Sequence, residues 1–474
     1  MVRKLSKLAL IALITIVVVA ATAISTTPPI HPIPELPAQS NLGLNLARSM
    51  KLLAESNNQQ SNTVRVLFYG QSITRDDWWK EVEADLKNRF PQADIITQNL
   101  AIGGFAAQRL VFNVERDILS FYPDLIIFHV YGDHFKYEEI IQKMRILTTA
   151  DIAIQTDHFG AKTDPKKPDS DWSDFMNNDF LPEIAEKYQC ELINVRSIWR
   201  QYLLDNNYQP SRLLRDDIHL NEHGNFLMSE SVKNNLVANK DAKDTKTDRV
   251  KTYKVNQDVD YKDGKFTLEF VGNRVDAISS PSGEAKAKIL IDGKPPSEIY
   301  ELYVFTRANY TPEVDWPWDV SAPFHINWEK PPVEEDWKIT ILNVEQQESE
   351  TLNFTFRLTG TKTGIDGVGS NQEVFISNSG RVVILPEHWW LKTVDGKPSP
   401  IKPGYELKFR SQLLGTDIYQ KPEFRGFNRE STVTLAQGLK NEEHTLEIIP
   451  LESGKVPISS IRVYNPPLRK KQSL

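Results

Sequence analysis

Apolar, β-branched runs alternate with stretches of helical periodicity between about residues 64 and 239. Runs typical of strands occur at 64–70, 93–100, 124–131, 151–156 and 191–195. Between and after them, apolar residues recur every three to four positions, which predicts helices at 76–90, 107–121, 137–149, 179–188 and 222–237. Strands that alternate with helices form a parallel sheet covered on both faces, so residues 63–238 are expected to be an α/β domain.

The pattern changes at the charged segment 239–251, "NKDAKDTKTDRVK", which we interpret as a linker. Residues 252–474 contain short strand-like runs separated by Gly, Pro, Asn and Asp, without crossover helices, which indicates an all-β sandwich region. We expect one jelly roll interrupted by an insertion near 310–400; two sandwiches are the alternative. Residues 360–373, "GTKTGIDGVGSNQE", lack the ligand spacing of a calcium loop and are expected to be a flexible loop.

The N-terminus predicts export. Residues 1–25 have basic residues at positions 3, 4 and 7, then an apolar run, then small residues with a candidate cleavage point after Ala23. This is the layout of a signal peptide; an uncleaved anchor through residues 8–25 is the alternative. Residues 26–62 follow as a Pro-rich tether and a short helix at 43–56. The chain is therefore expected to be secreted, periplasmic or anchored to the outer face of the cytoplasmic membrane.

Composition narrows the class of protein. The chain has 474 residues, a net charge of −7 and a pI of about 5.8, which argues against a nucleic-acid partner because such proteins normally show a basic face. Cys190 is the only cysteine, so there is no intrachain disulfide and stability must come from packed cores.

The polar residues that follow the strands carry the candidate chemistry, because ligands of open α/β sheets bind at the carboxyl ends of the strands. Acyl transfer needs a hydroxyl, a base, a carboxylate that orients the base, and N–H donors for the oxyanion. Ser72 can supply the hydroxyl and one N–H, and His219 with Asp216 can supply the base and its carboxylate. Gly103 or Gly104 can supply a second N–H. The alternative for Ser72 is an ordinary helix cap.

Further polar side chains at these strand ends could line the same pocket. They are Gln71, Asp133, His134, Asp157 and His158. No His-Glu-x-x-His or comparable ligand spacing is present, so we expect neither a metal nor a cofactor.

The ordered segments "GQSIT", "NLAIGG" and "DDIHLNEHG" resemble the blocks of the GDSL/SGNH hydrolase family, over about residues 64–237. The resemblance implies a flavodoxin-like three-layer fold and ester hydrolysis. It implies that Ser72 is the nucleophile, that Gly104 donates an oxyanion N–H, and that Asp216 rather than Asp217 pairs with His219. Gln71 stands in place of the family's aspartate.

The third block of the family departs most from the pattern. It usually supplies an oxyanion asparagine, whereas this chain reads "HVYGDH", with Gly132 or His134 near that position. Loss of one oxyanion donor typically costs ~10²–10³ in rate.

Together these features predict an exported serine-dependent ester hydrolase, with an acylated carbohydrate, such as an acetylated polysaccharide, as its substrate. One alternative is an O-acyltransferase that uses the same triad on a polysaccharide. The other is a non-catalytic envelope or carbohydrate-binding protein on an SGNH scaffold. The tryptophans of the β region are either platforms for sugar rings or core residues; they include Trp316, Trp318, Trp389 and Trp390.

Overall fold

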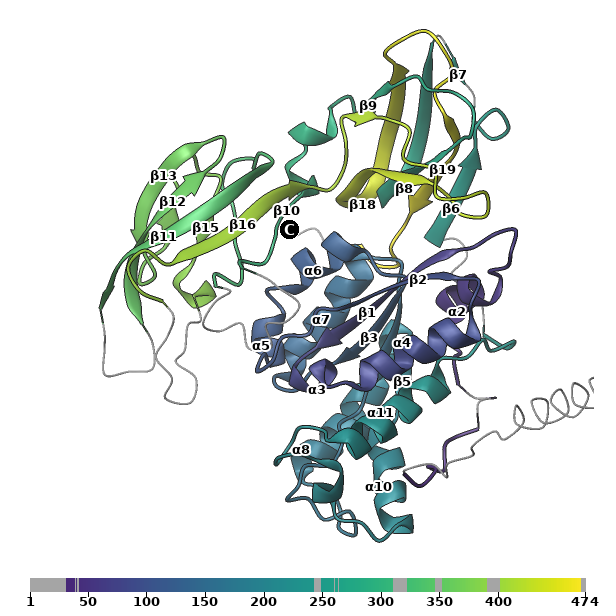
Figure 1. The fold of residues 1–474 in the computed structure, drawn as a ribbon, viewed down its shortest axis with the longest axis vertical. Coiled ribbons are helices and arrows are strands. Elements are labelled where there is room, and N and C mark those ends of the chain that lie inside the picture. Colours follow the sequence, from purple (N-terminus) through teal and green to yellow (C-terminus); the bar gives the residue numbers. More distant parts are fainter. Residues whose placement is uncertain are drawn as a thin grey trace, which may run out of the picture. The chain divides into compact units, whose positions relative to one another are not determined.

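The first five strands form a parallel sheet in the order β2-β1-β3-β4-β5 (Figure 1). The computed structural model describes residues 31–38, 40, 42–242, 249–259, 261–262, 264–309, 322–345, 352–389 and 401–469. The strand bounds are β1 Thr63–Gly70, β2 Asp94–Asn99, β3 Leu125–His129, β4 Asp151–Gln155 and β5 Glu191–Ile193. This order is that of flavodoxin-like doubly wound sheets, so the predicted fold class of this segment is confirmed.

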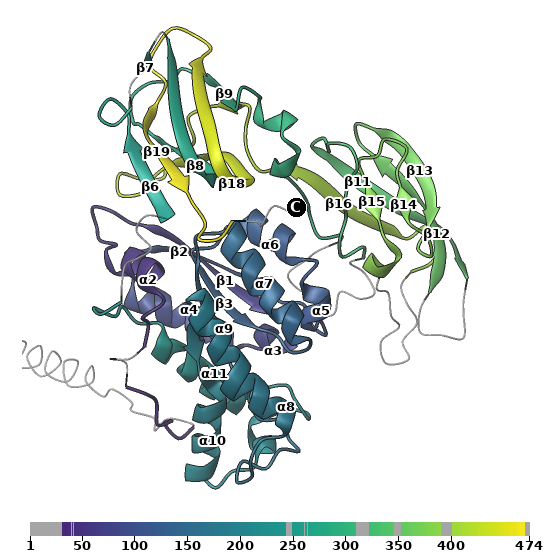
Figure 2. The ribbon, with the colours of Figure 1, turned by 180° about the vertical axis from the view of Figure 1, so that it is seen from behind.

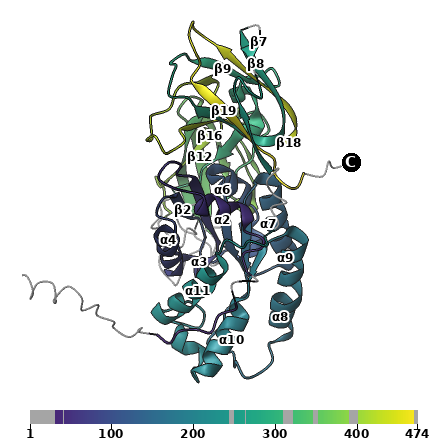
Figure 3. The same cartoon turned by 90° about the vertical axis from the view of Figure 1, so that its right-hand side faces the viewer.

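Helices cover both faces of this sheet because neighbouring strand residues point to opposite sides. Val66 and Phe68 of β1 pack with one helical layer, formed by α2 Ala47–Ala54, α4 Trp78–Arg89, α10 Val195–Asp205 and α11 Glu222–Asn235. Leu67 and Tyr69 pack with the other, formed by α5 Ala107–Leu110, α6 Val114–Phe121, α7 His134–Leu147 and α9 Leu181–Tyr188. Figures 2 and 3 show α7 and α9 on the side away from α4.

Three helical segments differ from the sequence prediction. The helix expected at 107–121 is divided into α5 and α6. The helix expected at 179–188 is preceded by α8 Asp171–Asp174 and a π-helical turn, Phe175–Phe180. The sequence pattern missed α10 altogether, because it begins directly after β5 without a Gly or Pro to separate them. Asn194 caps α10 by accepting a hydrogen bond from the Ser197 N–H.

The remaining strands form antiparallel sheets. Seven strands make the first, in the order β17-β9-β18-β8-β19-β6 with β7 paired to β8, and five make the second, in the order β10-β16-β11-β12-β13; β14 and β15 pair separately. The bounds in the first are β6 Val250–Lys254, β7 Tyr261–Lys262, β8 Lys265–Ser279, β9 Ala287–Ile291, β17 Ile418–Tyr419, β18 Thr432–Pro450 and β19 Ile458–Tyr464. The others are β10 Tyr303–Phe305, β11 Glu335–Glu345, β12 Asn353–Gly360, β13 Gly364–Ser370, β14 Phe375–Ile376, β15 Val383–Ile384 and β16 Glu406–Leu413. An α/β segment is thus followed by β sheets, as predicted.

Strands β9 and β18 lie side by side although the second sheet separates them in sequence; Ile291 pairs with Leu446. Strand β18 changes register against β8 between Gln437 and Glu442. The jelly-roll topology and the domain boundaries stay predictions.

The expectation of a flexible loop at 360–373 is wrong, because β13 lies there and pairs with β12. Its glycines make room for a neighbouring ring: a Cβ on Gly369 would lie 2.4 Å from the Phe375 side chain. The strand was missed because glycine has a low strand propensity. Here glycine lets the strand approach an aromatic side chain closely.

The α/β segment and the β region contact each other within the compact unit of residues 36–474. Arg307 pairs with the buried Asp117 of α6 at 2.6 Å and donates to the Leu100 carbonyl. The rings of Phe105 and Phe324 meet edge to face, with centroids 4.8 Å apart. Burial opposes ionisation of Asp117, but the arginines at positions 116 and 307 lower the pKa of its carboxyl.

Several sequence predictions fall outside the described residues. They are the signal peptide at 1–25, the alternative membrane anchor at 8–25, and the tryptophans Trp316, Trp318 and Trp390. Trp389 is buried against Phe354 and Phe356, which makes it a core residue. Among the described residues, no helix has both the length and the apolar character needed to cross a membrane.

Candidate active site

Ser72 begins a one-turn helix, α3 Ser72–Arg75, directly after the carboxyl end of β1. The chain can turn there because residue 70 is glycine: a Cβ would lie 1.9 Å from the His129 carbonyl oxygen. The Oε1 of Gln71 caps α3 by accepting from the Ile73 N–H at 3.2 Å. Cap and strand end together fix the position of the Ser72 hydroxyl.

His219 lies on the loop before α11, and buried groups hold this loop to the domain. The Asp76 carboxylate accepts from the Leu220 N–H at 2.9 Å and from Arg215 at 2.6 Å. The Nε2–H of His158 donates to the Ile218 carbonyl at 2.7 Å. Burial raises the pKa of Asp76 and lowers the pKa of His158 to about 4, so His158 is neutral near pH 7.

Ser72, His219 and Asp216 form a continuous hydrogen-bonded path. His219 Nε2 lies 3.0 Å from Ser72 Oγ, and His219 Nδ1 lies 2.8 Å from an oxygen of Asp216. The other oxygen of Asp216 accepts from the N–H groups of Ile218 and His219 at 2.8 and 2.7 Å.

The charge on Asp216 sets the tautomer of His219. Partial burial opposes ionisation of Asp216, but its hydrogen bonds with His219 and Ile218 prevail and lower its pKa to about 2. An ionised carboxylate only accepts hydrogen bonds, so His219 Nδ1 carries the proton and Nε2 is free to accept the proton of Ser72. Asp217 instead points to Lys162 at 2.6 Å, away from His219.

Two backbone N–H groups are available for an oxyanion. Gly103 and Gly104 form the turn after β2, at the same edge of the sheet as Ser72. Within the hydrogen bonds of the described residues, neither the Ser72 N–H nor the Gly104 N–H has an acceptor. Both are therefore open to a ligand oxygen.

The segment "HVYGDH" at the end of β3 has structural roles. Asp133 caps α7 by accepting from the Lys136 N–H at 2.9 Å. The ring of His134 packs against Trp172, Phe175 and Phe180 in an aromatic cluster. Among the described residues, no hydrogen bond or ring contact joins either side chain to Ser72.

A second hydrogen-bonded path lies beside the first and contains a residue that the sequence analysis missed. Gln71 Nε2 lies 3.3 Å from Nδ1 of His129, and His129 Nε2 lies 2.8 Å from Asp157. Because the Ile73 N–H fixes the Gln71 carbonyl, its amide N–H donates to His129, whose Nε2–H donates to Asp157. Burial opposes ionisation of Asp157, but the bond from His129 prevails and lowers its pKa.

His129 was missed because it ends an apolar strand and is buried, as a core residue would be. The one available signal was a titratable residue inside the run "DLIIFHV". His223, a second buried histidine, instead packs in the core and pairs with the hydroxyl of Tyr202 at 2.7 Å. In the described part of the chain, no group of three or more His, Cys, Asp or Glu side chains could hold a metal ion.

This chain is similar to several solved esterase structures. No protein-family model and no curated protein matches the sequence. A two-domain esterase active on acetylated mannans is 15% identical, with 89% of this chain and 95% of that chain covered and a TM-score of 0.35. An acetyl xylan esterase is 25% identical, with 36% of this chain and 98% of that chain covered and a TM-score of 0.31. An acetylxylan esterase from Geobacillus stearothermophilus is 16% identical, with 38% of this chain and 96% of that chain covered and a TM-score of 0.33. TM-scores below 0.5 assign no function to this chain.

Proposed function

We propose that this protein is an exported, serine-dependent ester hydrolase of the SGNH type that removes acetyl groups from carbohydrate. The observation that carries the proposal is the path from Ser72 through His219 to Asp216, with distances of 3.0 and 2.8 Å. These distances lie within the reach that nucleophile activation requires.

In the first step, Ser72 Oγ attacks the carbonyl carbon of the ester. His219 Nε2 takes the hydroxyl proton, and Asp216 stabilises the imidazolium that forms. The N–H groups of Ser72 and Gly104 stabilise the negative charge on the carbonyl oxygen. The bond between the carbonyl carbon and the sugar oxygen then breaks, His219 gives its proton to that oxygen, and an acetyl group remains on Ser72.

The second step repeats this chemistry with water. His219 removes a proton from the water as it attacks the acetyl carbonyl, and then protonates Ser72 as acetate leaves. The net reaction consumes one water and yields acetate, the free sugar hydroxyl and one proton, which acetic acid releases to solvent. His219 carries the two protons that are transferred within the site.

The exposure of the triad favours a large substrate, and exposed aromatic side chains follow strands β3 and β4. The side chains of His219 and Asp216 are 20% and 50% exposed. Aromatic side chains at the same edge of the sheet are also exposed: Tyr131 at 47%, Phe135 at 70% and Trp172 at 51%. Sugar rings present apolar faces that stack on such side chains, whereas a narrow buried slot would favour a small acyl ester.

Acetate release from an acetylated polysaccharide tests this proposal, with wild-type protein and Ser72→Ala compared. Ser197→Ala is the matched control because Ser197 is an exposed serine on α10. We expect release by wild type and Ser197→Ala, and none by Ser72→Ala. Equal release by all three variants, or none by any, would refute the proposal. Acetyl transfer to an added sugar in place of acetate release would indicate the acyltransferase.

A further inference from the structure

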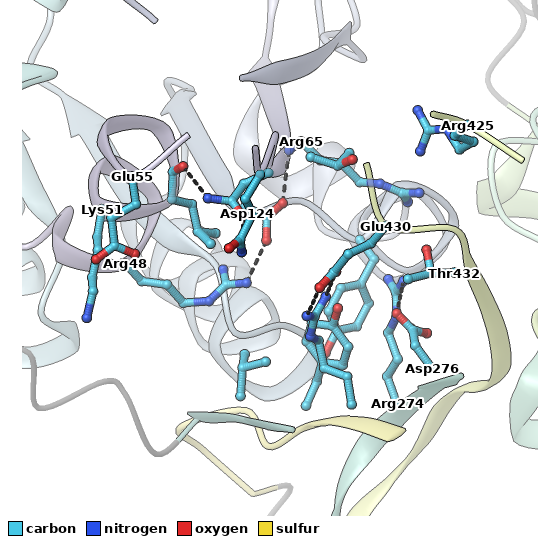
Figure 4. A pocket seen from close by; sticks show the side chains of 18 residues that line it. Arg48, Lys51, Glu55, Arg65, Asp124, Arg274, Asp276, Arg425, Glu430 and Thr432 are labelled. Atoms are coloured by element: carbon cyan, nitrogen blue, oxygen red, sulfur yellow. Dashed lines mark hydrogen bonds and ion pairs between the residues drawn. The ribbon is translucent and has the colours of Figure 1, made fainter. Parts of the chain in front are cut away.

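A charged cavity, shown in Figure 4, lies near the amino ends of the parallel strands, whereas Ser72 lies at their carboxyl ends. Arg65 lies near the start of β1 and Asp124 directly precedes β3, whereas Ser72 follows the other end of β1. The cavity has a volume of about 320 Å³. Sites for small ligands begin at about 300 Å³, so one small molecule fits here.

The α/β segment and the β region both contribute to this cavity, and basic side chains outnumber acidic ones in its lining. The basic residues are Arg48, Lys51, Arg65, Arg274, Arg425 and Arg462. The acidic residues are Glu55, Asp124, Asp276 and Glu430.

Four of the arginines pair with carboxylates, and one of these pairs is Arg48 with Asp124 at 2.7 Å. Arg274 pairs with Asp276 at 2.7 Å, and its guanidinium lies 4.6 Å and 4.8 Å from the ring centres of Tyr122 and Tyr464. Arg462 pairs with Glu430 at 2.7 Å. Arg425 pairs at 2.7 Å with Asp94, which lies outside the lining. The positive charge of each of these arginines is thus paired with a carboxylate.

Two arginines keep hydrogen-bonding capacity: Arg65, and Arg48 in addition to its pair with Asp124. Arg65 donates from Nη1 to the Phe121 carbonyl at 2.9 Å, and its guanidinium has no carboxylate partner among the described residues. Asp124 lies near Arg65, but its described hydrogen bonds come from Arg48 and from the backbone N–H of Arg65, not from the Arg65 guanidinium. The Nη1 of Arg48 is buried and has no acceptor in the described structure.

The electrostatics of Arg65 agree with an excess of positive charge. Burial and the nearby positive charge of Arg274 lower the pKa of the Arg65 guanidinium, and they outweigh Asp124 and Asp276, which raise it. A guanidinium that is repelled by a neighbouring cation and lacks a carboxylate is stabilised by an added anion.

We propose that this cavity is a second ligand site, in which Arg65 binds the carboxylate of an acidic sugar. A carboxylate matches the planar fork of a guanidinium and can accept two hydrogen bonds from it. Gln60 and Thr432 of the same lining can bind sugar hydroxyls. Asn62 and Thr63 already donate to the Leu52 carbonyl and to Asp94, so the Thr63 hydroxyl can only accept from a ligand. The site is separate from the triad, so it does not depend on the esterase activity.

Calorimetric titration of the full chain with trigalacturonate tests the proposal, with the neutral sugar maltotriose as the comparison ligand. Wild type and Ser72→Ala are expected to bind trigalacturonate equally and maltotriose not at all. Arg65→Gln is expected to weaken binding at least about tenfold, the effect of one lost charge-assisted hydrogen bond. Affinity should fall as salt is raised.

Two further variants keep the test decisive. Lys51→Gln changes an exposed lining residue and does not endanger folding, and it is expected to weaken binding about threefold. Arg410→Gln changes an exposed arginine of β16 outside the cavity and should bind like wild type. The proposal is overturned if wild type does not bind trigalacturonate, or if Arg65→Gln and Lys51→Gln both bind it as tightly as wild type. It is also overturned if wild type binds inorganic phosphate as tightly as trigalacturonate.

Discussion

The side-chain oxygen of Gln71 lies 2.7 Å from the Ser72 hydroxyl. This oxygen can only accept, so the single hydroxyl proton points either to Gln71 or to Nε2 of His219 at 3.0 Å. Before reaction the hydroxyl proton is therefore shared between two acceptors, and only its transfer to His219 leads to reaction. Gln71 holds the nucleophile in place, and it stays neutral while the oxyanion forms.

Gln71→Glu should slow the reaction. The variant keeps an acceptor for Ser72 but adds a negative charge beside the oxygen on which charge develops. We expect kcat for a chromogenic acetyl ester to fall about ten- to hundredfold. Gln71→Met, which removes the acceptor without adding charge, serves as the comparison and should lose less. A Gln71→Glu enzyme as fast as wild type would show that this side chain does not act on the nucleophile.

Two neighbouring carboxylates give a matched test of the orienting residue. Asp216→Asn removes the charge that fixes the tautomer of His219 and should lower kcat by about 10³–10⁴, as in other triads. Asp217→Asn changes the next carboxylate, which is exposed and pairs with Lys162, and should leave kcat unchanged. Steady-state rates of both variants decide this, and equal rates would contradict the assignment of Asp216.

His129→Phe tests the second path, because it removes both the acceptor for Gln71 and the donor to Asp157. We expect kcat to fall about tenfold with KM nearly unchanged, since Ser72 loses its fixed neighbour but substrate contacts remain. His223→Phe is the control, because His223 is as deeply buried but bonds to Tyr202 in the core. A loss confined to thermal stability in both variants would make His129 a core residue only.

The buried His158 should make the protein less stable in mild acid. Burial lowers its folded pKa to about 4, below the ordinary value of 6.5. As pH falls below about 6.5 the unfolded chain binds a proton that the folded chain does not, so the free energy of unfolding falls until about pH 4. The loss approaches about 3 kcal/mol.

Urea unfolding at pH 7 and at pH 4.5 measures this effect. His158→Asn, which cannot take up a proton, should lose less stability than wild type between the two pH values. An identical loss in both proteins would assign the acid sensitivity to other groups.

The local patterns that predicted the sheet are strong because each β strand is short, apolar and followed by a helical repeat. The proximity of Ser72, Asp216 and His219 could be anticipated because strand ends gather at one edge and Asp-x-x-His brings two of the three together. Sequence patterns could not separate His129 from a core residue, because its role depends on Gln71 and Asp157 in other loops. The cavity around Arg65 was equally hidden, since its charges come from strands more than two hundred positions apart.

Covalent labelling of the nucleophile tests the central claim most directly. The full chain is treated with a serine-reactive fluorophosphonate, and the labelled peptide is identified by mass spectrometry. We predict one label, on Ser72, with ester hydrolysis lost in proportion to labelling and with slow labelling of His219→Ala. A protein that stays unlabelled, or a label on another serine that abolishes hydrolysis while Ser72 stays free, would contradict the account.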